Sequence, residues 1–300
     1  MSKISEIKEI AMEINECLTK HDLLYKPTFD HFDLNMSGNI ITNHNATCKL
    51  SDIIFKNYFF QEPLTQYHHF TRLEFFDSII TQKELWLFSI KKRFGEGEFK
   101  PFYDAHNMDG YSLRKNAAGI AMEDELVDNA FYISFTGDSL PEYDEKDMWS
   151  CFAGKDGVRL VFEVSNVNTH LRSIHYPSPK SETYLPLLKD LIAIAAKRDK
   201  MMIIKGTATI GFFYLRKDLH YEQECRLLVK RDIGEFYQMT FGKNKDGYEY
   251  MRFPIDSENP IAKFKLKKVI VRNEQDLEAI KHKLNLSNAY RNLEIELRNL

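Results

Sequence analysis

Cysteine is scarce in this sequence, and the four that occur, Cys17, Cys48, Cys151 and Cys225, stand far apart. None belongs to a Cys-x-x-Cys pair. This spacing favours a reduced, cytosolic protein over a disulfide framework or a zinc site, and we expect no metal.

Long hydrophobic runs are lacking too, and no apolar stretch approaches the roughly 18 residues of a membrane span. The opening residues, Met-Ser-Lys-Ile-Ser-Glu-Ile-Lys-Glu, are too charged for a secretory signal peptide. Excess charge of one sign is small. A net charge of -3 argues against a broad electrostatic surface for nucleic acid, although it is compatible with a local basic patch. We therefore expect a cytoplasmic protein without membrane contact.

Aromatic residues are plentiful, with 22 Phe and 15 Tyr, and the hydrophobic fraction is 43%. A chain of 300 residues with this composition can bury a sizeable core. We find no repeat, no low-complexity tract and no long linker. The pattern predicts an N-terminal extension over residues 1–62, made of an amphipathic helix over 4–20 and a hairpin over 31–42, followed by one main domain over 63–300.

The main domain alternates strand and helix patterns, which predicts an α+β fold. Thr71 is expected to cap the first helix, with Glu74 completing a capping box. A loop is expected over 91–110, and the apolar stretch 203–215 is ambiguous, with helix favoured. The expected strands are 67–71, 85–88, 130–136, 157–164, 170–175, 236–241, 248–253, 264–271 and 292–297; the expected helices are 72–81, 112–127, 181–198 and 274–283.

The stretch 221–229 reads Tyr-Glu-Gln-Glu-Cys-Arg-Leu-Leu-Val and ends in a strand-like apolar run. Because side chains alternate along a strand, Glu222, Glu224 and Arg226 are expected on one face. Such a face suits the wall of a polar cleft. Taken alone, an exposed mixed-charge strand face is the commoner interpretation.

Two other features have a structural interpretation beside a functional one. The adjacent His68 and His69 lack Cys or His neighbours at metal spacing, which favours structural histidines. Trp149 is either a core anchor or a stacking platform for a flat ligand, and core anchors are more common.

The order of the motifs is more specific than any one of them. The sequence carries His69-x-Thr71, then Ser134-Phe135-Thr136, then Met148-Trp149, then Glu222-x-Glu224-x-Arg226. This order resembles an uncharacterised bacterial family with the pattern Tyr-His-Tyr-Thr, Ser-Phe, Met-Trp-Ser-x-Tyr, Gly-Val and Tyr-Glu-x-Glu-x-Arg. It also looks like the three-part active site of the ADP-ribosyltransferase superfamily. The resemblance covers residues 65–300.

The resemblance implies an ADP-ribosyltransferase-like split β-sheet core with flanking helices, and a glycosyltransferase that uses NAD as substrate. Glu224 matches the glutamate that binds the nicotinamide ribose and stabilises an oxocarbenium-like transition state. Glu222 matches the residue that orients the acceptor. Arg226 is expected to balance the two carboxylates or to contact a diphosphate.

The same resemblance assigns cofactor-binding roles to the earlier motifs. His69, supported by Thr71, is expected at the adenosine-side ribose. Ser134 and Thr136 are expected to hold the nicotinamide-ribose end and to orient Glu224. The candidates for aromatic stacking are Tyr132, Trp149 and Phe152.

The resemblance implies transfer to a protein or nucleic-acid acceptor by a bacterial toxin or phage-defence effector, which a neutralising antitoxin or partner protein would accompany. Two alternatives stay open, an NAD glycohydrolase and a catalytically silent binding module on the same fold. The second is favoured by two departures from the family pattern. Lys91–Glu96 replaces an Asn-Asp-Pro segment, and the bulky Phe135 occupies the middle of the Ser-Thr-Ser position.

Overall fold

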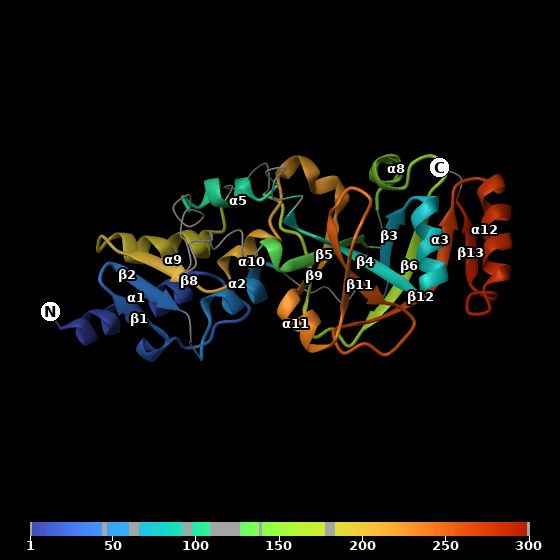
Figure 1. Cartoon of the computed structure of the whole chain (residues 1–300). Helices are drawn as coiled ribbons and strands as arrows, with labels where there is room; N and C mark the ends of the chain where they lie inside the picture. Colours follow the sequence, from blue (N-terminus) through green and yellow to red (C-terminus); the bar gives the residue numbers. More distant parts are fainter. Residues whose placement is uncertain are drawn as a thin grey trace. The chain divides into compact units, whose positions relative to one another are not determined.

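The computed structural model describes residues 2–43, 47–59, 66–91, 93, 98–108, 127–137, 140–177 and 184–298. The chain forms two compact units, each assembled from separate stretches of sequence (Figure 1). Unit 1 comprises Met1–Phe60, Gly97–Glu123 and Ile174–Lys217; unit 2 comprises Gln61–Glu96, Asp124–Ser173 and Asp218–Leu300. Helices and sheets occur together, which confirms the α+β class.

Unit 1 holds a three-stranded sheet in the order β1-β2-β8. Its strands are β1 (Asn35–Ser37), β2 (Ile40–Asn43) and β8 (Met201–Ile204). The expected hairpin is confirmed but lies further along the chain. Ser37 pairs with Ile40 around Gly38, whose φ of 58° is readily adopted by glycine. Residues 31–33 form a 3₁₀ turn, η1 (His31–Asp33), instead of a strand.

The helices of unit 1 are α1 (Lys3–Lys20), α2 (Leu50–Tyr58), α5 (Lys100–Ala105), α9 (Pro186–Ala196) and α10 (Thr207–Gly211). The predicted N-terminal helix is confirmed as α1. It buries Ile10, Ile14 and Leu18 at helical spacing, because these positions share one helix face.

The prediction of a separate N-terminal extension is corrected. Helix α1 packs against α9, and β2 pairs in parallel with β8, so the first 60 residues share a core with 174–217. The sequence pattern instead predicts that residues 174–217 belong to the main domain over 63–300. Pairing between segments so far apart leaves no local signal in composition or periodicity.

Unit 2 is built on a ten-stranded sheet with the order β10-β11-β4-β5-β3-β6-β12-β13, in which β9 also pairs with β5 and with β7. Its strands are β3 (Tyr67–Thr71), β4 (Glu84–Ser89), β5 (Ala130–Thr136), β6 (Val158–Ser165), β7 (His170–Ser173), β9 (Glu224–Lys230), β10 (Thr240–Lys243), β11 (Glu249–Pro254), β12 (Lys263–Val271) and β13 (Glu294–Leu297).

Strand β5 is where this sheet forks. Strand β9 pairs with β5 along its whole length and so occupies one edge. Strands β4 and β3 must then share the other edge. There Phe88 of β4 pairs with Tyr132, and His68 of β3 pairs with Thr136. The stretch of β5 around Ser134 therefore lies between two diverging strands.

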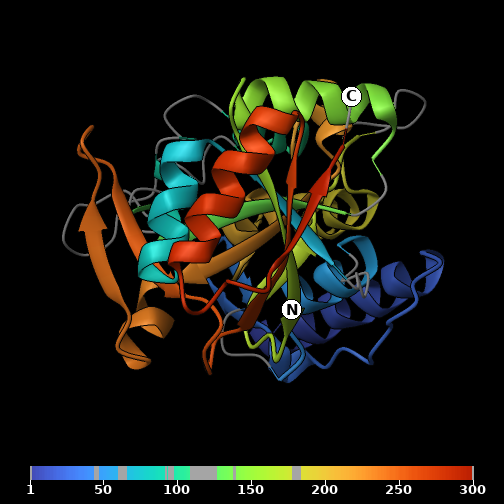
Figure 2. The same cartoon turned by 90° about the vertical axis from the view of Figure 1, so that its right-hand side faces the viewer.

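The two faces of the sheet carry different layers. One face buries apolar side chains of the strands under α3 (Leu73–Gln82) and α12 (Glu274–Leu286), which lie side by side and are joined by an ion pair of Lys283 with Asp77 (Figure 2). The other face carries α8 (Glu142–Met148) and a π-helical turn, η2 (Trp149–Ala153). The remaining elements are η3 (Lys217–Glu222) and α11 (Arg231–Phe236).

Gly157 allows η2 and β3 to approach each other. A Cβ at this position would lie 2.1 Å from the carbonyl oxygen of Ala153 and 2.6 Å from that of Thr71. Any side chain would separate the π-helical turn from the end of β3.

Several local expectations differ from the structure. Helix α3 begins after Arg72 and lacks a side-chain cap, while Thr71 ends β3. Residues 203–215 divide into the end of β8 and the short α10. Helix α5 occupies part of the expected loop 91–110, and α9 begins at Pro186. The expected helix 112–127 lies almost wholly outside the described residues. Among the residues the structure describes, no helix is long and apolar enough to cross a membrane.

Candidate functional site

The two glutamates at the centre of the sequence prediction lie on different elements. Strand β9 begins at Glu224, whereas Glu222 ends the 3₁₀ turn η3. Between them Gln223 has a φ of 41°, in the left-handed region. This conformation interrupts strand alternation, so the expectation that Glu222 shares a strand face with Glu224 and Arg226 is wrong.

Glu224 is held in a fixed position by its neighbours on β5 and β9. Its Oε1 accepts a hydrogen bond from Ser134 Oγ at 2.5 Å and another from Arg226 Nε at 2.8 Å, and its Oε2 accepts from Arg226 Nη2 at 3.1 Å. Only 4% of Glu224 and 2% of Arg226 are exposed. Charge-assisted hydrogen bonds of this kind give a carboxylate a defined orientation.

The same face of the sheet carries the other predicted residues of β5. Ser134 pairs with Arg226 and Thr136 pairs with Glu224, so these side chains and that of Tyr132 share one face. The Thr136 hydroxyl donates to the carbonyl oxygen of Gly137 at 3.3 Å. The structure thus brings Tyr132, Ser134, Thr136, Glu224 and Arg226 together.

His69 reaches this site through the backbone of Ser134. Its Nδ1 lies 2.9 Å from the Ser134 carbonyl oxygen, at the fork between β3 and β4. A carbonyl oxygen only accepts, so we assign the hydrogen to Nδ1. Burial lowers the pKa of His69, which keeps the ring neutral and leaves Nε2 as an acceptor. Ser134 therefore links the two residues: its carbonyl oxygen accepts from His69, and its hydroxyl donates to Glu224.

A cavity of about 80 Å³ opens beside His69 and Thr71. Its aromatic lining comes from Trp86 and Phe88 of β4 and from Phe75 of α3, and Trp86 also stacks on Tyr250 with ring centres 4.2 Å apart. Because Phe88 pairs with Tyr132, alternation places Trp86 and Phe88 on the face that carries Ser134. The volume is far below the roughly 300–1,000 Å³ of pockets that enclose drug-sized ligands, so this cavity does not enclose a ligand of that size.

Trp149 is not part of this lining. It is 0% exposed and packs edge-on against Phe70, with ring centres 5.3 Å apart, while the Arg272 guanidinium lies 5.2 Å from its ring centre. A fully buried indole offers no face to a ligand, so the stacking role predicted for Trp149 is wrong and the core interpretation holds. Trp86, by contrast, lines the cavity and is only partly buried. Sequence periodicity gave no reason to prefer it within an apolar strand.

Arginines surround Tyr132 on this face. The Arg226 guanidinium lies 4.8 Å from the Tyr132 ring centre, and Arg93 Nε donates to the Tyr132 hydroxyl at 2.9 Å. On β7, Arg172 pairs with Arg226 across the strands. Arg93 and Arg172 were not predicted as site residues, because their position depends on strand pairing. Their charges make this face suitable for an anionic ligand.

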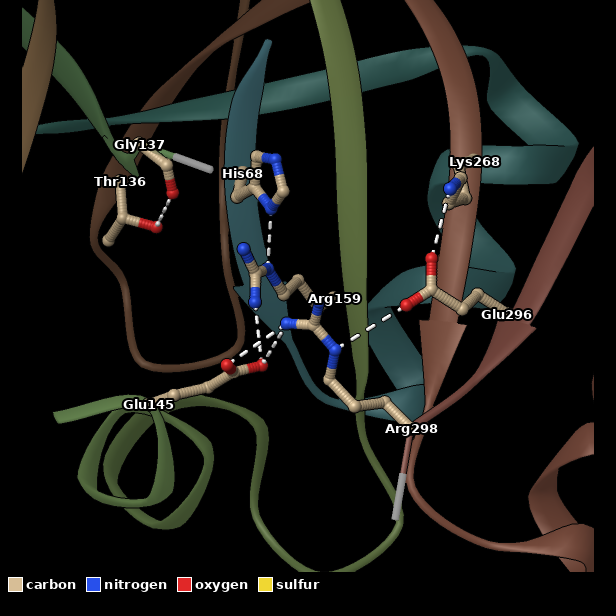
Figure 3. A network of polar contacts seen from close by, with 8 residues as sticks. All are labelled: His68, Thr136, Gly137, Glu145, Arg159, Lys268, Glu296 and Arg298. Atoms are coloured by element: carbon tan, nitrogen blue, oxygen red, sulfur yellow. Dashed lines mark hydrogen bonds and ion pairs between the residues drawn. The ribbon is translucent and has the colours of Figure 1, made fainter. Parts of the chain in front are cut away.

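A buried polar network lies next to the site, around Arg159 of β6 (Figure 3). Arg159 is 0% exposed. Its Nε donates to His68 Nδ1 at 2.5 Å, and its Nη1 donates to Glu145 Oε1 at 2.6 Å. Arg298 Nη1 donates to both oxygens of Glu145, at 2.9 and 3.0 Å. The network joins α8, β3 and the C-terminal residues to β6.

His68 connects this network with the site. Burial, reinforced by the nearby Arg159, lowers the pKa of His68 to about 3, so the ring is neutral and accepts at Nδ1. His68 pairs with Thr136, which in turn pairs with Glu224. The Arg159 network therefore fixes β3 in the register that places His69 at the fork.

Comparisons with known proteins assign no family to the chain, since no family model, curated protein or solved structure matches it.

Proposed function

We propose that this protein is an NAD-dependent ADP-ribosyltransferase, which cleaves the nicotinamide–ribose bond and transfers ADP-ribose to a protein or nucleic-acid acceptor. The observation that carries the proposal is the chain of contacts from His69 through Ser134 to Glu224. These residues are far apart in sequence, and a single dinucleotide site requires them to be close together. An ADP-ribosyltransferase-like core is part of the proposal, and the fork at β5 supports it.

The chemistry requires a fixed negative group near the reacting ribose. As nicotinamide leaves, positive charge builds on the ribose ring, and a preorganised carboxylate stabilises it. Glu224 is the candidate, because its contacts with Ser134 and Arg226 hold it in place before substrate arrives. Its role is to accept a hydrogen bond from the ribose 2′-hydroxyl.

The neighbouring groups supply binding and orientation. His69 Nε2 accepts a hydrogen bond from a sugar hydroxyl, and Thr71 lines the same cavity. Trp86 offers an aromatic face to one of the flat rings of NAD. The diphosphate is drawn to Arg93 and Arg172, whose forked guanidinium groups can bind its oxygens in pairs, while Arg226 adds positive charge and holds Glu224.

The position of Glu222 bears on the fate of ADP-ribose. Glu222 lies on the turn η3 and not on the strand that carries Glu224. The two carboxylates therefore lack the two-residue strand spacing that would place Glu222 to orient a side-chain acceptor. This observation favours NAD glycohydrolase, with water as the acceptor, as the second candidate. A toxin or phage-defence role and an accompanying antitoxin are proposed by resemblance alone. A cytoplasmic location is proposed from the wide separation of the four cysteines.

The test is nicotinamide release from NAD by the purified chain, followed by mass spectrometry of the products. ADP-ribose attached to protein or nucleic acid supports transfer; free ADP-ribose alone supports the hydrolase. The matched control is Glu235→Gln, which changes an exposed glutamate on α11. If the unmodified chain neither binds nor cleaves NAD in the presence of lysate acceptors, the proposal is wrong.

A further inference from the structure

A second cluster of chemically capable side chains lies in unit 1, where α1 ends beside α9. Cys17 lies in the last turn of α1, and His21 caps the helix and donates its backbone N–H to the Cys17 carbonyl oxygen. Asp190 comes from α9. One ligand atom from each of the three residues lies within 4.8 Å of the others. Among the residues that the structure describes, no other group of this composition is so close together.

We propose that Cys17, His21 and Asp190 bind a zinc ion. Thiolate sulfur, imidazole nitrogen and carboxylate oxygen are the ligands that Zn²⁺ takes in proteins, at about 2.3, 2.0 and 2.1 Å. In a tetrahedral site such bonds place the ligand atoms about 3.5 Å apart. The largest separation in the cluster, up to 4.8 Å, must shorten by about 1.3 Å to reach this value, while the 3.0 Å between His21 Nε2 and Asp190 Oδ2 must lengthen by about 0.5 Å.

The charges in the cluster suit a divalent cation. A thiolate and a carboxylate together neutralise Zn²⁺, and Cys17 loses its thiol proton to solvent when the Zn–S bond forms. His21 Nε2 already lies 3.0 Å from Asp190 Oδ2, so the imidazole and the carboxylate are held together before metal arrives. Metal binding requires the tautomer with its hydrogen on Nδ1, which frees the Nε2 lone pair, and it replaces this contact with two bonds to the metal.

The exposure of the three groups gives the ion a route in and leaves a position for water. Cys17 is 7% exposed, whereas the side chains of His21 and Asp190 are 16% and 59% exposed. The fourth ligand is then water from the open side. A site with three protein ligands and water resembles catalytic zinc sites in its ligand count, and here it also joins two helices of unit 1.

A catalytic thiol explains the cluster less well. Reactive cysteines are exposed and have a lowered pKa. Cys17 is buried, with only 7% of the residue exposed. A thiol in this environment is a poor nucleophile, whereas a metal ion can displace its proton.

The experiment uses the full chain, treated with chelator and dialysed against Zn²⁺ or Co²⁺. Bound metal is measured by elemental analysis, and Co²⁺ also reports sulfur coordination through its thiolate charge-transfer absorption. We expect one tightly held ion per chain. Cys17→Ser should remove the charge-transfer band, and both Cys17→Ser and Asp190→Asn should weaken binding by about 100-fold or more, beyond the effect of losing an outer partner.

Cys48→Ser is the matched control, because Cys48 also belongs to unit 1 but lies outside the cluster. Asp190→Asn is on an exposed side chain, so it tests the site even if Cys17→Ser fails to fold. The proposal is wrong if the chain holds no metal above the level of Cys17→Ser or Asp190→Asn. It is equally wrong if Cys48→Ser reduces binding as much as they do. None of these outcomes depends on NAD chemistry.

Discussion

Ser134 and Glu224 are joined across two adjacent strands by a hydrogen bond of 2.5 Å from the serine hydroxyl to Oε1. Ninety positions of sequence separate them. Since Ser134 also accepts from His69 with its carbonyl, one residue sets the position of both predicted ends of the site.

Ser134→Ala should therefore misorient Glu224 without removing it. We expect NAD cleavage to fall by ~10- to 100-fold, because small errors in position are costly in preorganised sites. Steady-state kinetics should show the loss mainly in kcat. Ser134→Thr keeps a hydroxyl and should retain more activity than Ser134→Ala. Equal activity in wild type and Ser134→Ala would contradict the positioning role.

Trp86 should affect binding more than chemistry. Loss of a stacked ring is worth ~1–1.5 kcal/mol, so Trp86→Ala should raise the KM for NAD about tenfold with a small change in kcat. Trp86→Phe should preserve most of the affinity. Phe236→Ala, which removes a 79% exposed aromatic on α11, is the control. An unchanged KM in Trp86→Ala would exclude stacking at this lining.

The buried network should matter for stability. Glu145 is shared by Arg159 and Arg298, so Glu145→Ala leaves the fully buried Arg159 guanidinium without its carboxylate partner. Breaking a buried ion pair costs about 3–5 kcal/mol, which urea unfolding would detect. Glu142→Ala removes a solvent-exposed pair with Lys146 on the same helix and should change little. Similar midpoints for the two variants would show that the network is not a stabilising one.

The lowered pKa of His68 predicts that the folded protein loses stability in acid. Its pKa is lowered to about 3 in the fold, against roughly 6.5 in an unfolded chain. Between these values the unfolded state binds the proton and the folded state does not, so stability falls as pH falls from about 6.5 towards 3. His68→Asn keeps an acceptor for Arg159 Nε but cannot titrate.

Urea unfolding at a series of pH values tests this. In the His68→Asn variant the loss of stability with falling pH should be shallower by up to ~1.4 kcal/mol per pH unit, the contribution of one proton. If wild type and variant lose stability equally with falling pH, His68 does not bind a proton preferentially in the unfolded state.

Local pattern predicted much of unit 2. The alternation in β6 placed Val158, Leu160 and Phe162 on the core face, as the structure confirms. The boundaries of β5 were predicted correctly, because the strand is bordered by polar residues. Local pattern could not predict strand pairing between distant parts of the chain. The pairing of β2 with β8 is an example, and it changes how the chain divides into units.

Two residues of the site, Glu222 and Trp149, were placed wrongly from the sequence. Glu222 was assigned to a strand because Gln223 carries no sign of its left-handed conformation, which glycine or asparagine would have suggested. Trp149 and Trp86 are chemically alike, and only tertiary packing determines which is buried. The contact of His69 with a backbone carbonyl was likewise not predictable, because it depends on the fork at β5.

The most direct test of the proposed function is NAD cleavage by Glu224→Gln. The amide preserves shape but removes the charge, and we expect nicotinamide release to fall by ~10²- to 10³-fold while the urea midpoint shows that the chain remains folded. Glu235→Gln should behave as wild type. Nicotinamide release by folded Glu224→Gln at the wild-type rate would contradict the account.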